Sequence, residues 1–98
     1  MIYHIISITA WNAQQDADAV HVPSLQTEGF IHCCTREQIA GVLSRYFKEK
    51  DGLLLLEIDE SKLTAPVRFE VATDNELFPH VFGSINRSAI VGVKPIGV

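Results

Sequence analysis

Membrane-spanning and export signals are missing from this chain of 98 residues. No apolar stretch approaches the roughly 20 residues that a membrane-spanning helix needs. The start of the chain also lacks the basic segment and long apolar segment of a signal peptide. The sequence therefore predicts no membrane partner, and we expect a cytoplasmic protein.

Positive charge is also scarce, with eight Lys and Arg residues against twelve Asp and Glu residues and a net charge of −4. Binding to nucleic acid or to an anionic membrane relies on clustered Lys and Arg side chains. The basic residues here are scattered along the chain, so the charge argues against nucleic acid as a partner.

Cysteine and glycine are too few to form the common cofactor motifs. The chain has no Gly-x-Gly-x-x-Gly and no phosphate-binding glycine loop, which excludes the P-loop and Rossmann classes. The two cysteines, Cys33 and Cys34, lack the partner spacing of a structural zinc site. Neighbouring strand residues point to opposite faces, so a disulfide between them would be strained, and we expect reduced structural thiols.

Apolar residues make up 47% of the chain, and the mean hydropathy is +0.15. This balance, without a charge block, a repeat or a linker, predicts one compact domain over residues 1–98. Period-two alternation predicts most of its strands. The expected strands cover residues 2–8, 30–34, 53–58, 67–72 and 89–93. In the fourth, Val67, Phe69 and Val71 alternate with Arg68 and Glu70, which predicts one polar face.

Two helices are expected between these strands, one strong and one weak. The strong helix begins with the capping-box spacing of Thr35 and Gln38. Its apolar stripe consists of Ile39, Val42, Leu43, Tyr46 and Phe47. The weak helix covers residues 10–20, with Thr9 as its cap. Residues 21–25 are expected to be extended, because Pro23 restricts the backbone before it. The pattern predicts an α+β domain with a mostly antiparallel sheet of about five to six strands.

Histidines stand among apolar residues at three places. His32 ends the run Gly29-Phe30-Ile31-His32, His80 follows Phe78-Pro79, and His4 shares a strand face with isoleucines. Histidine can donate, accept or ligate near neutral pH, so such surroundings predict a polar pocket within an apolar wall. We expect His4, His32 and His80 to line one cleft that binds a small molecule.

Structural roles are the alternatives for these residues. His4 and His32 could bond backbone carbonyls in the core, and His80 could stabilise a turn after Pro79. Trp11 is more often a core residue than a stacking platform, and Arg68 and Glu70 could form an ion pair with each other. A metal held by the three histidines, with metal-dependent hydrolysis as its chemistry, is a minor alternative, and the leading interpretation contains no metal site.

The order of motifs resembles the small bacterial domain-of-unknown-function family 952 (DUF952), over almost the whole chain. The motifs are Ile2-Tyr3-His4-Ile5, Trp11, Pro23-Ser24-Leu25, Glu28-Gly29-Phe30-Ile31-His32-Cys33, Val67-Arg68-Phe69-Glu70 and Phe78-Pro79-His80-Val81-Phe82-Gly83. His21 departs from the pattern, because the family more often has a tyrosine there. The resemblance implies a split-sheet fold like that of the ADP-ribosyltransferases and RNA 2′-phosphotransferases.

That resemblance also implies a ligand and residue roles. NAD or a related nucleotide would bind in the cleft, with His4 on the ribose or amide and His32 on the nicotinamide end. A carboxylate, Glu70 or Glu76, would stabilise the sugar cation as nicotinamide leaves. His4, His32 and Glu70 are the expected catalytic residues. The expected ligand-binding residues are His4, Trp11, Ser24, Gly29, Phe30, His32, Phe78 and His80. The competing hypothesis is a non-catalytic module that binds a small ligand or a protein partner.

Overall fold

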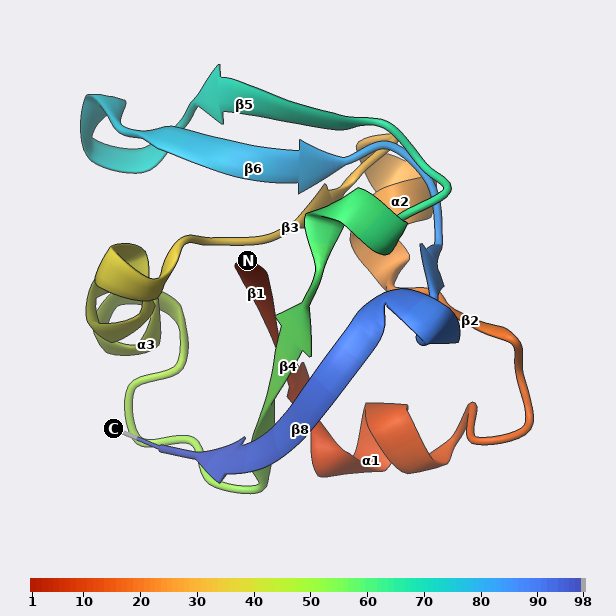
Figure 1. The fold of residues 1–98 in the computed structure, drawn as a ribbon. Helices are drawn as coiled ribbons and strands as arrows, with labels where there is room; N and C mark the ends of the chain where they lie inside the picture. Colours follow the sequence, from red (N-terminus) through yellow and green to blue (C-terminus); the bar gives the residue numbers. More distant parts are fainter. Residues whose placement is uncertain (98) are drawn as a thin grey trace.

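Three antiparallel sheets carry the fold, and the computed structural model describes residues 1–97 (Figure 1). The sheets have the strand orders β1-β4-β8, β3-β6-β5 and β2-β7. The strands are β1 (Ile2–Ser7), β2 (Ala19–Val20), β3 (Ile31–His32), β4 (Leu53–Ile58), β5 (Val67–Val71), β6 (Leu77–Val81), β7 (Ile85–Asn86) and β8 (Ile90–Ile96). The α-helices are α1 (Ile8–Asn12), α2 (Pro23–Thr27) and α3 (Ile39–Tyr46), and the 3-10 turns are η1 (Arg36–Gln38), η2 (Glu60–Lys62), η3 (Thr73–Asn75) and η4 (Arg87–Ala89). The α+β class is confirmed for the described chain.

The sheet β1-β4-β8 contains the most apolar strands. β4 lies between β1 and β8, and five of its six residues are buried. β1 pairs with it from Ile2 opposite Ile58 to Ser7 opposite Leu53. The predicted strand over residues 53–58 is therefore confirmed, and the first strand ends one residue earlier than expected, because Ser7 caps α1.

A single bridge joins this sheet to the sheet β3-β6-β5. The Tyr3 amide donates to the Cys34 carbonyl, and the Cys34 amide donates to the Tyr3 carbonyl, both at 2.8 Å. β3 then pairs with β6, with His32 opposite His80. The expected strand over residues 30–34 is thus reduced to two ladder residues and this bridge, since the chain must bend from one sheet to the other.

The predicted helix over residues 10–20 is wrong. α1 begins earlier, with the Ser7 hydroxyl accepting from the Ala10 amide at 3.0 Å, and ends at Asn12. Beyond it, the Gln14 side chain bonds the backbone of His21, and the Arg87 side chain donates to the carbonyls of Gln14 and Ala17. These contacts satisfy the backbone of a loop in place of helical hydrogen bonds.

The prediction of an extended connector over residues 21–25 is also wrong from Pro23 onward, where α2 begins. Val22 is extended, as the following proline requires, with φ −135° and ψ 157°. Pro23 then occupies the first turn of α2, where its missing amide hydrogen costs no helical hydrogen bond. The chain leaves α2 through Gly29, whose φ of 88° suits glycine.

Two prolines lie inside strands where the sequence predicts turns or strand ends. Pro79 is the middle residue of β6, so His80 lies in a strand and does not stabilise a turn. The predicted last strand, 89–93, instead continues through Pro95 in β8. Alternation in the β4 ladder points the backbone nitrogen of Pro95 to the outer edge of the sheet. β8 therefore accepts its proline without losing a ladder donor. In the central strand β6, the Pro79 carbonyl accepts from the Cys33 amide at 3.1 Å, but Pro79 has no amide hydrogen to donate in return.

The helix α3 confirms the expected strong helix. The Gln38 side chain accepts from the Thr35 amide at 3.0 Å, as the capping-box spacing predicts. Leu43 is buried against a cluster that contains Tyr3, Ile5 and Leu55. The same Gln38 donates to the carbonyl of Leu77 at 2.9 Å, which fixes the start of the helix to the hairpin of β5 and β6.

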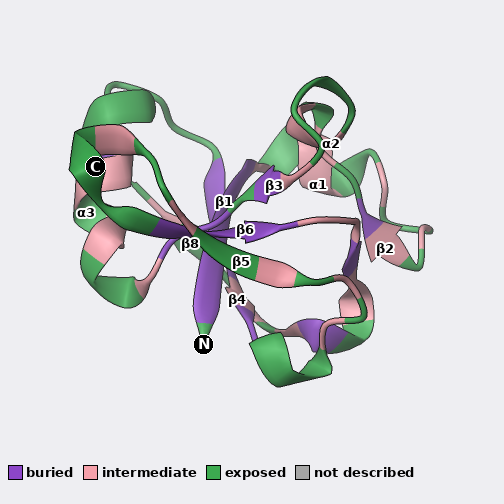
Figure 2. Ribbon diagram, turned by 90° about the horizontal axis from the view of Figure 1, so that it is seen from above, coloured by how far each residue is buried: buried purple, intermediate pink, exposed green. Residues whose placement is uncertain are grey.

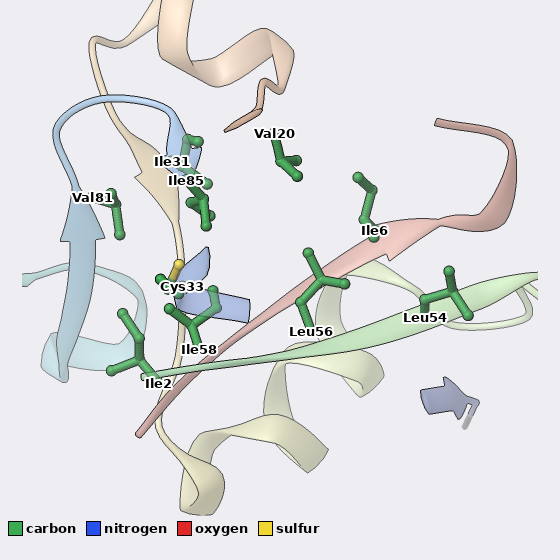
Figure 3. Packing of buried hydrophobic residues seen from close by; sticks show 11 residues of the cluster. Ile2, Ile6, Val20, Ile31, Cys33, Leu54, Leu56, Ile58, Val81 and Ile85 are labelled. Atoms are coloured by element: carbon green, nitrogen blue, oxygen red, sulfur yellow. The ribbon is translucent and has the colours of Figure 1, made fainter. Parts of the chain in front are cut away.

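The larger core cluster fills the space between the sheets (Figure 3). Its members come from both large sheets, from β2 and β7, from the residue after β3 and from η4: Ile2, Ile6, Val20, Ile31, Cys33, Leu54, Leu56, Ile58, Val81, Ile85 and Ala89. In β5 the alternation predicted one polar face, and the residues of its apolar face include Phe69 and Val71. They are 47% and 61% exposed, because no element of the described chain covers that end of the hairpin.

The packing of the core predicts that two isoleucines contribute very differently to the stability of the fold. Ile58 is fully buried in the larger cluster, whereas Ile8 is 39% exposed. We expect Ile58→Ala to lower the free energy of unfolding by about 2–5 kcal/mol, since it leaves a cavity, and the control Ile8→Ala to lower it by less than about 1 kcal/mol. Urea denaturation measures both, and equal losses would contradict this assignment of the core.

Candidate functional site

A cavity of about 540 Å³ lies where the two large sheets part beyond the bridge between Tyr3 and Cys34. β1 forms one wall, with Tyr3 to Ser7 along its length. Pro23 and Ser24 close one end, while α3 and the hairpin of β5 and β6 close the other. The lining is mostly apolar, and no Lys, Arg, Asp or Glu side chain within residues 1–97 belongs to it. Polar chemistry in the cavity therefore depends mainly on its histidines.

His4 lines this cavity from β1 and is uncharged. Its Nδ1 donates to the His32 carbonyl at 2.6 Å, since a carbonyl oxygen can only accept. Burial lowers the pKa of His4 below its ordinary value of 6.5. At neutral pH the hydrogen therefore stays on Nδ1, and Nε2 carries a lone pair. The structure combines the two roles considered for His4, a bond to a backbone carbonyl and a place in the cleft wall.

His80 lines the cavity from β6 and is 4% exposed. Its Nδ1 lies 2.8 Å from a carboxylate oxygen of Glu70, so Nδ1 carries the donated hydrogen. Its Nε2 is buried and has no hydrogen-bond partner within the described chain. Buried polar atoms are nearly always paired, so this nitrogen calls for a ligand or water. A carboxylate on one imidazole nitrogen also makes the other a better proton acceptor.

His32 lies at the rim of the cleft, with its side chain 52% exposed. Its Nε2 is 2.9 Å from a carboxylate oxygen of Glu28. The ring of Phe30 stacks on His80 at 4.0 Å between centroids and meets the edge of His32 at 4.8 Å. Phe30 therefore holds both imidazoles in place from one side.

The backbone of β1 adds a donor and an acceptor. Both backbone groups of Tyr3 turn away from β4 to reach Cys34. Because outward and inward residues alternate in an antiparallel ladder, the amide and carbonyl of Ile5 turn the same way. The antiparallel bridge would place His32 opposite Ile5, but the His32 carbonyl accepts from the His4 side chain instead. No described residue therefore bonds the Ile5 backbone, although Ile5 is buried and lines the cavity.

The structure thus brings together most of the residues that the sequence analysis selected for the site. His4, His32, His80, Ser24 and Phe78 all line the cavity. Phe30 and Glu70 act through His80, and Ser24 also donates to the Phe30 carbonyl at 2.8 Å. Gly29 is not in the wall but turns the chain toward Phe30.

Trp11 and Glu76 are not brought to this cleft. Trp11 packs against the larger core cluster, with the Arg87 guanidinium 4.5 Å from its ring centroid. Glu76 lies at the hairpin, near Gln38. The suggested pair of Arg68 and Glu70 is not formed either, because Glu70 bonds His80 and Arg68 lies over the ring of Phe82 at 4.9 Å.

Sequence reasoning missed Glu28 and the backbone of Ile5. Glu28 and His32 are four residues apart, a spacing that could have suggested the pair. Nothing in the sequence marks Ile5. The three histidines, in turn, do not form a metal-ligating group with other residues in the part of the chain that the structure describes. In each of the three histidines, one ring nitrogen already has a hydrogen-bond partner. His4 bonds the His32 carbonyl, His32 bonds Glu28, and His80 bonds Glu70.

Cys33 and Cys34 line the same cavity as free thiols. Burial raises the pKa of Cys34 to about 11 and raises that of Cys33 as well, with the neighbouring Cys34 as a second cause. A thiol is nucleophilic only as its thiolate. At neutral pH both groups therefore act as packing residues.

Comparison with known proteins gives a family but no activity. The family model described as "Protein of unknown function (DUF952)" matches residues 5–93. No curated protein matches the chain. Within residues 1–97, no helix is long and apolar enough to cross a membrane.

Solved structures with the same fold come from Caulobacter crescentus. The crystal structure of protein CC0527 has a TM-score of 0.88 and 22% identity, with 99% of this chain and 86% of that chain covered. The solution NMR structure of CC0527 has a TM-score of 0.84 and 22% identity, with 99% and 84% covered. This likeness shows the fold alone, and kinship with the ADP-ribosyltransferases stays a prediction.

A buried, neutral His4 makes the stability of the fold depend on pH. Its pKa in the folded state lies below the 6.5 of an exposed histidine, so below that pH the unfolded state binds more protons. The stabilisation is complete above about pH 6.5 and falls as the pH drops toward the folded pKa, by up to about 1.4 kcal/mol per pH unit.

We expect His4→Asn to flatten this dependence, because its amide can still donate to the His32 carbonyl but does not titrate. Denaturant unfolding between neutral pH and about pH 5 measures the slope. The exposed His21 offers a control, and His21→Asn should keep the wild-type slope. The same slope in wild type and His4→Asn would show that His4 is not the group responsible.

Proposed function

The chain belongs to the DUF952 family, whose function is unknown, and we propose that its histidine-lined cleft binds a primary carboxamide group. The nicotinamide end of NAD or a related nucleotide is one such group. The observation that carries the proposal is the buried Nε2 of His80, a ring nitrogen without a hydrogen-bond partner in the described chain. A ligand N–H or O–H would supply that partner and recover the cost of burying the nitrogen.

The unpaired backbone groups of Ile5 in β1 favour a carboxamide as the ligand. Ile5 presents an amide donor and a carbonyl acceptor side by side in the cavity wall. A primary carboxamide has the complementary pair, a carbonyl oxygen and an NH₂ group, at matching spacing. The Nε2 of His4, on the preceding residue, is a further acceptor, because the other nitrogen of that ring is already bonded.

The charge of the cavity limits what enters it. No Lys or Arg in the described chain lines the wall, so nothing there compensates the two charges of a diphosphate. An aromatic amide fits this apolar space, and the diphosphate of a dinucleotide would have to stay at the solvent-exposed rim near His32. The site therefore supports recognition of the nicotinamide end and not of the whole nucleotide.

Glu70 and His80 would give the site its chemistry. In transfer from NAD, the bond between the ribose and the nicotinamide nitrogen breaks, and its electron pair goes to the ring. An attacking hydroxyl forms the new bond to the ribose carbon and gives its proton to His80 Nε2, once the amide of the departing nicotinamide has released that nitrogen. Glu70 stabilises the imidazolium through Nδ1, and His32 orients the ligand at the rim. The same cleft without an attacking group would be a binding module, which is the competing function.

Titration with nicotinamide and, separately, with NAD tests the proposal. We expect saturable shifts of backbone amide signals around Ile5 and His80 with nicotinamide. His80→Asn keeps a donor for Glu70 but lacks the Nε2 acceptor, and it should raise Kd about tenfold, the value of one buried hydrogen bond. His21→Asn is the matched control and should bind like the wild type.

The two ligands separate the outcomes. Binding of both, with equal effects of His80→Asn, supports the nucleotide. Binding of nicotinamide alone restricts the function to free carboxamides and removes the transferase chemistry. No shifts with either ligand at millimolar concentration would overturn the proposal and favour the interaction module. Unchanged affinity in His80→Asn would reject the role of His80.

A further inference from the structure

β5 is an edge strand with open hydrogen-bonding groups (Figure 1). The Phe82 amide donates to the Pro66 carbonyl, and the Ala72 amide to the Glu76 carbonyl, so even-numbered residues make the ladder with β6. By alternation, the amides and carbonyls of Val67, Phe69 and Val71 point away from β6. No hydrogen bond within residues 1–97 uses them.

The same strand exposes an apolar face. Phe69, Val71 and the neighbouring Leu77, which pairs with Val71, are each about half exposed or more. Figure 2 shows β5 largely exposed beside the buried β6. Open edges with apolar side chains invite pairing with another strand, and proteins usually block them with proline or with charged side chains. β5 contains no proline, and its two charges, Arg68 and Glu70, have opposite signs, so they can pair with those of a second strand.

We propose that this edge pairs with a second copy of the chain, β5 against β5, antiparallel about a two-fold axis at Phe69. In this register Phe69 lies opposite its own equivalent, and Val67 lies opposite Val71. These are the three residues with outward backbone groups, so each exchanges hydrogen bonds with its partner. Arg68 of each copy then lies opposite Glu70 of the other. This interaction is independent of the ligand proposed above.

Charge selects this register over its neighbours. An axis at Arg68 would place two arginines opposite each other, and an axis at Glu70 would place two glutamates opposite each other. Like charges directly opposite destabilise a strand pair, whereas opposite charges stabilise it. The segment Val67-Arg68-Phe69-Glu70-Val71 is thus self-complementary only about Phe69.

The pairing would also reach the histidine cleft. Glu70 uses one carboxylate oxygen for His80 and is 43% exposed. Arg68 of the second copy would lie beside its other oxygen, since these two residues face each other on the side of the sheet that carries His80. Each copy would therefore supply a cation to the pair of Glu70 and His80 in the other, and the two sheets would join into one.

Sedimentation velocity over micromolar to millimolar concentrations tests this arrangement. The wild type should rise from the chain mass of 10.9 kDa toward twice that value. Arg68→Glu and Glu70→Arg each place like charges opposite one another and should raise the dimer Kd by about tenfold or more. An equal mixture of the two variants restores both opposite-charge pairs and should associate as the wild type does.

Phe69→Lys places two cations at the axis and should abolish association. The control is Val93→Lys on the outer edge of β8, which is similarly exposed and should leave association unchanged. Should Glu70→Arg fail to fold, Arg68→Glu and Phe69→Lys decide the question. A wild type that stays at 10.9 kDa at millimolar concentration would overturn the proposal, as would variants that associate like the wild type or a mixture that does not associate.

Discussion

The bridge between Tyr3 and Cys34 is the contact on which the rest of the structure depends. Its two hydrogen bonds hold the sheets β1-β4-β8 and β3-β6-β5 together at one level and leave them free to part beyond it. The cavity lies in that fork. The bridge also shows that Tyr3 turns away from β4, and by alternation in the ladder with β4 the Ile5 backbone turns toward the cavity. Buried Tyr3 is fixed in turn by Arg36, which donates to its hydroxyl at 2.9 Å.

Histidines supply most of the polar groups in the otherwise apolar cavity between the two large sheets. A charged side chain would be costly in this space, whereas a neutral imidazole is tolerated once one nitrogen has a partner. A backbone carbonyl bonds one nitrogen of His4, and a carboxylate bonds one nitrogen of His80. In both rings the partner bonds Nδ1 and leaves Nε2 without a hydrogen-bond partner in the described chain. The fold thereby fixes the orientation of both imidazoles in the cavity wall.

The sequence predicted correctly those elements whose structure depends on interactions within one segment of the chain. The apolar run of β4 and the capped, striped helix α3 were confirmed, because each pattern reflects burial and capping within one segment. The helix over residues 10–20 was wrong because Arg87, some 70 residues away, satisfies the loop carbonyls. Likewise, the apolar motifs indicated a histidine cleft, but the contact between Glu70 and His80 depends on the register of β5 and β6. Sequence spacing does not encode that register.

The outer edges of β8 and β5 show how differently a strand edge can be protected. On β8, alternation turns Val93 and Pro95 outward, and Pro95 has no amide hydrogen to offer a partner. Lys94, beside it, is occupied by Glu57 at 3.3 Å. On β5 all three outward residues keep both backbone groups, and the intervening charges complement a reversed copy of the strand. The β8 edge therefore lacks a backbone donor at Pro95, where a partner strand would need one. The β5 edge retains all the donors, acceptors and charges that a reversed copy of the same strand would pair with.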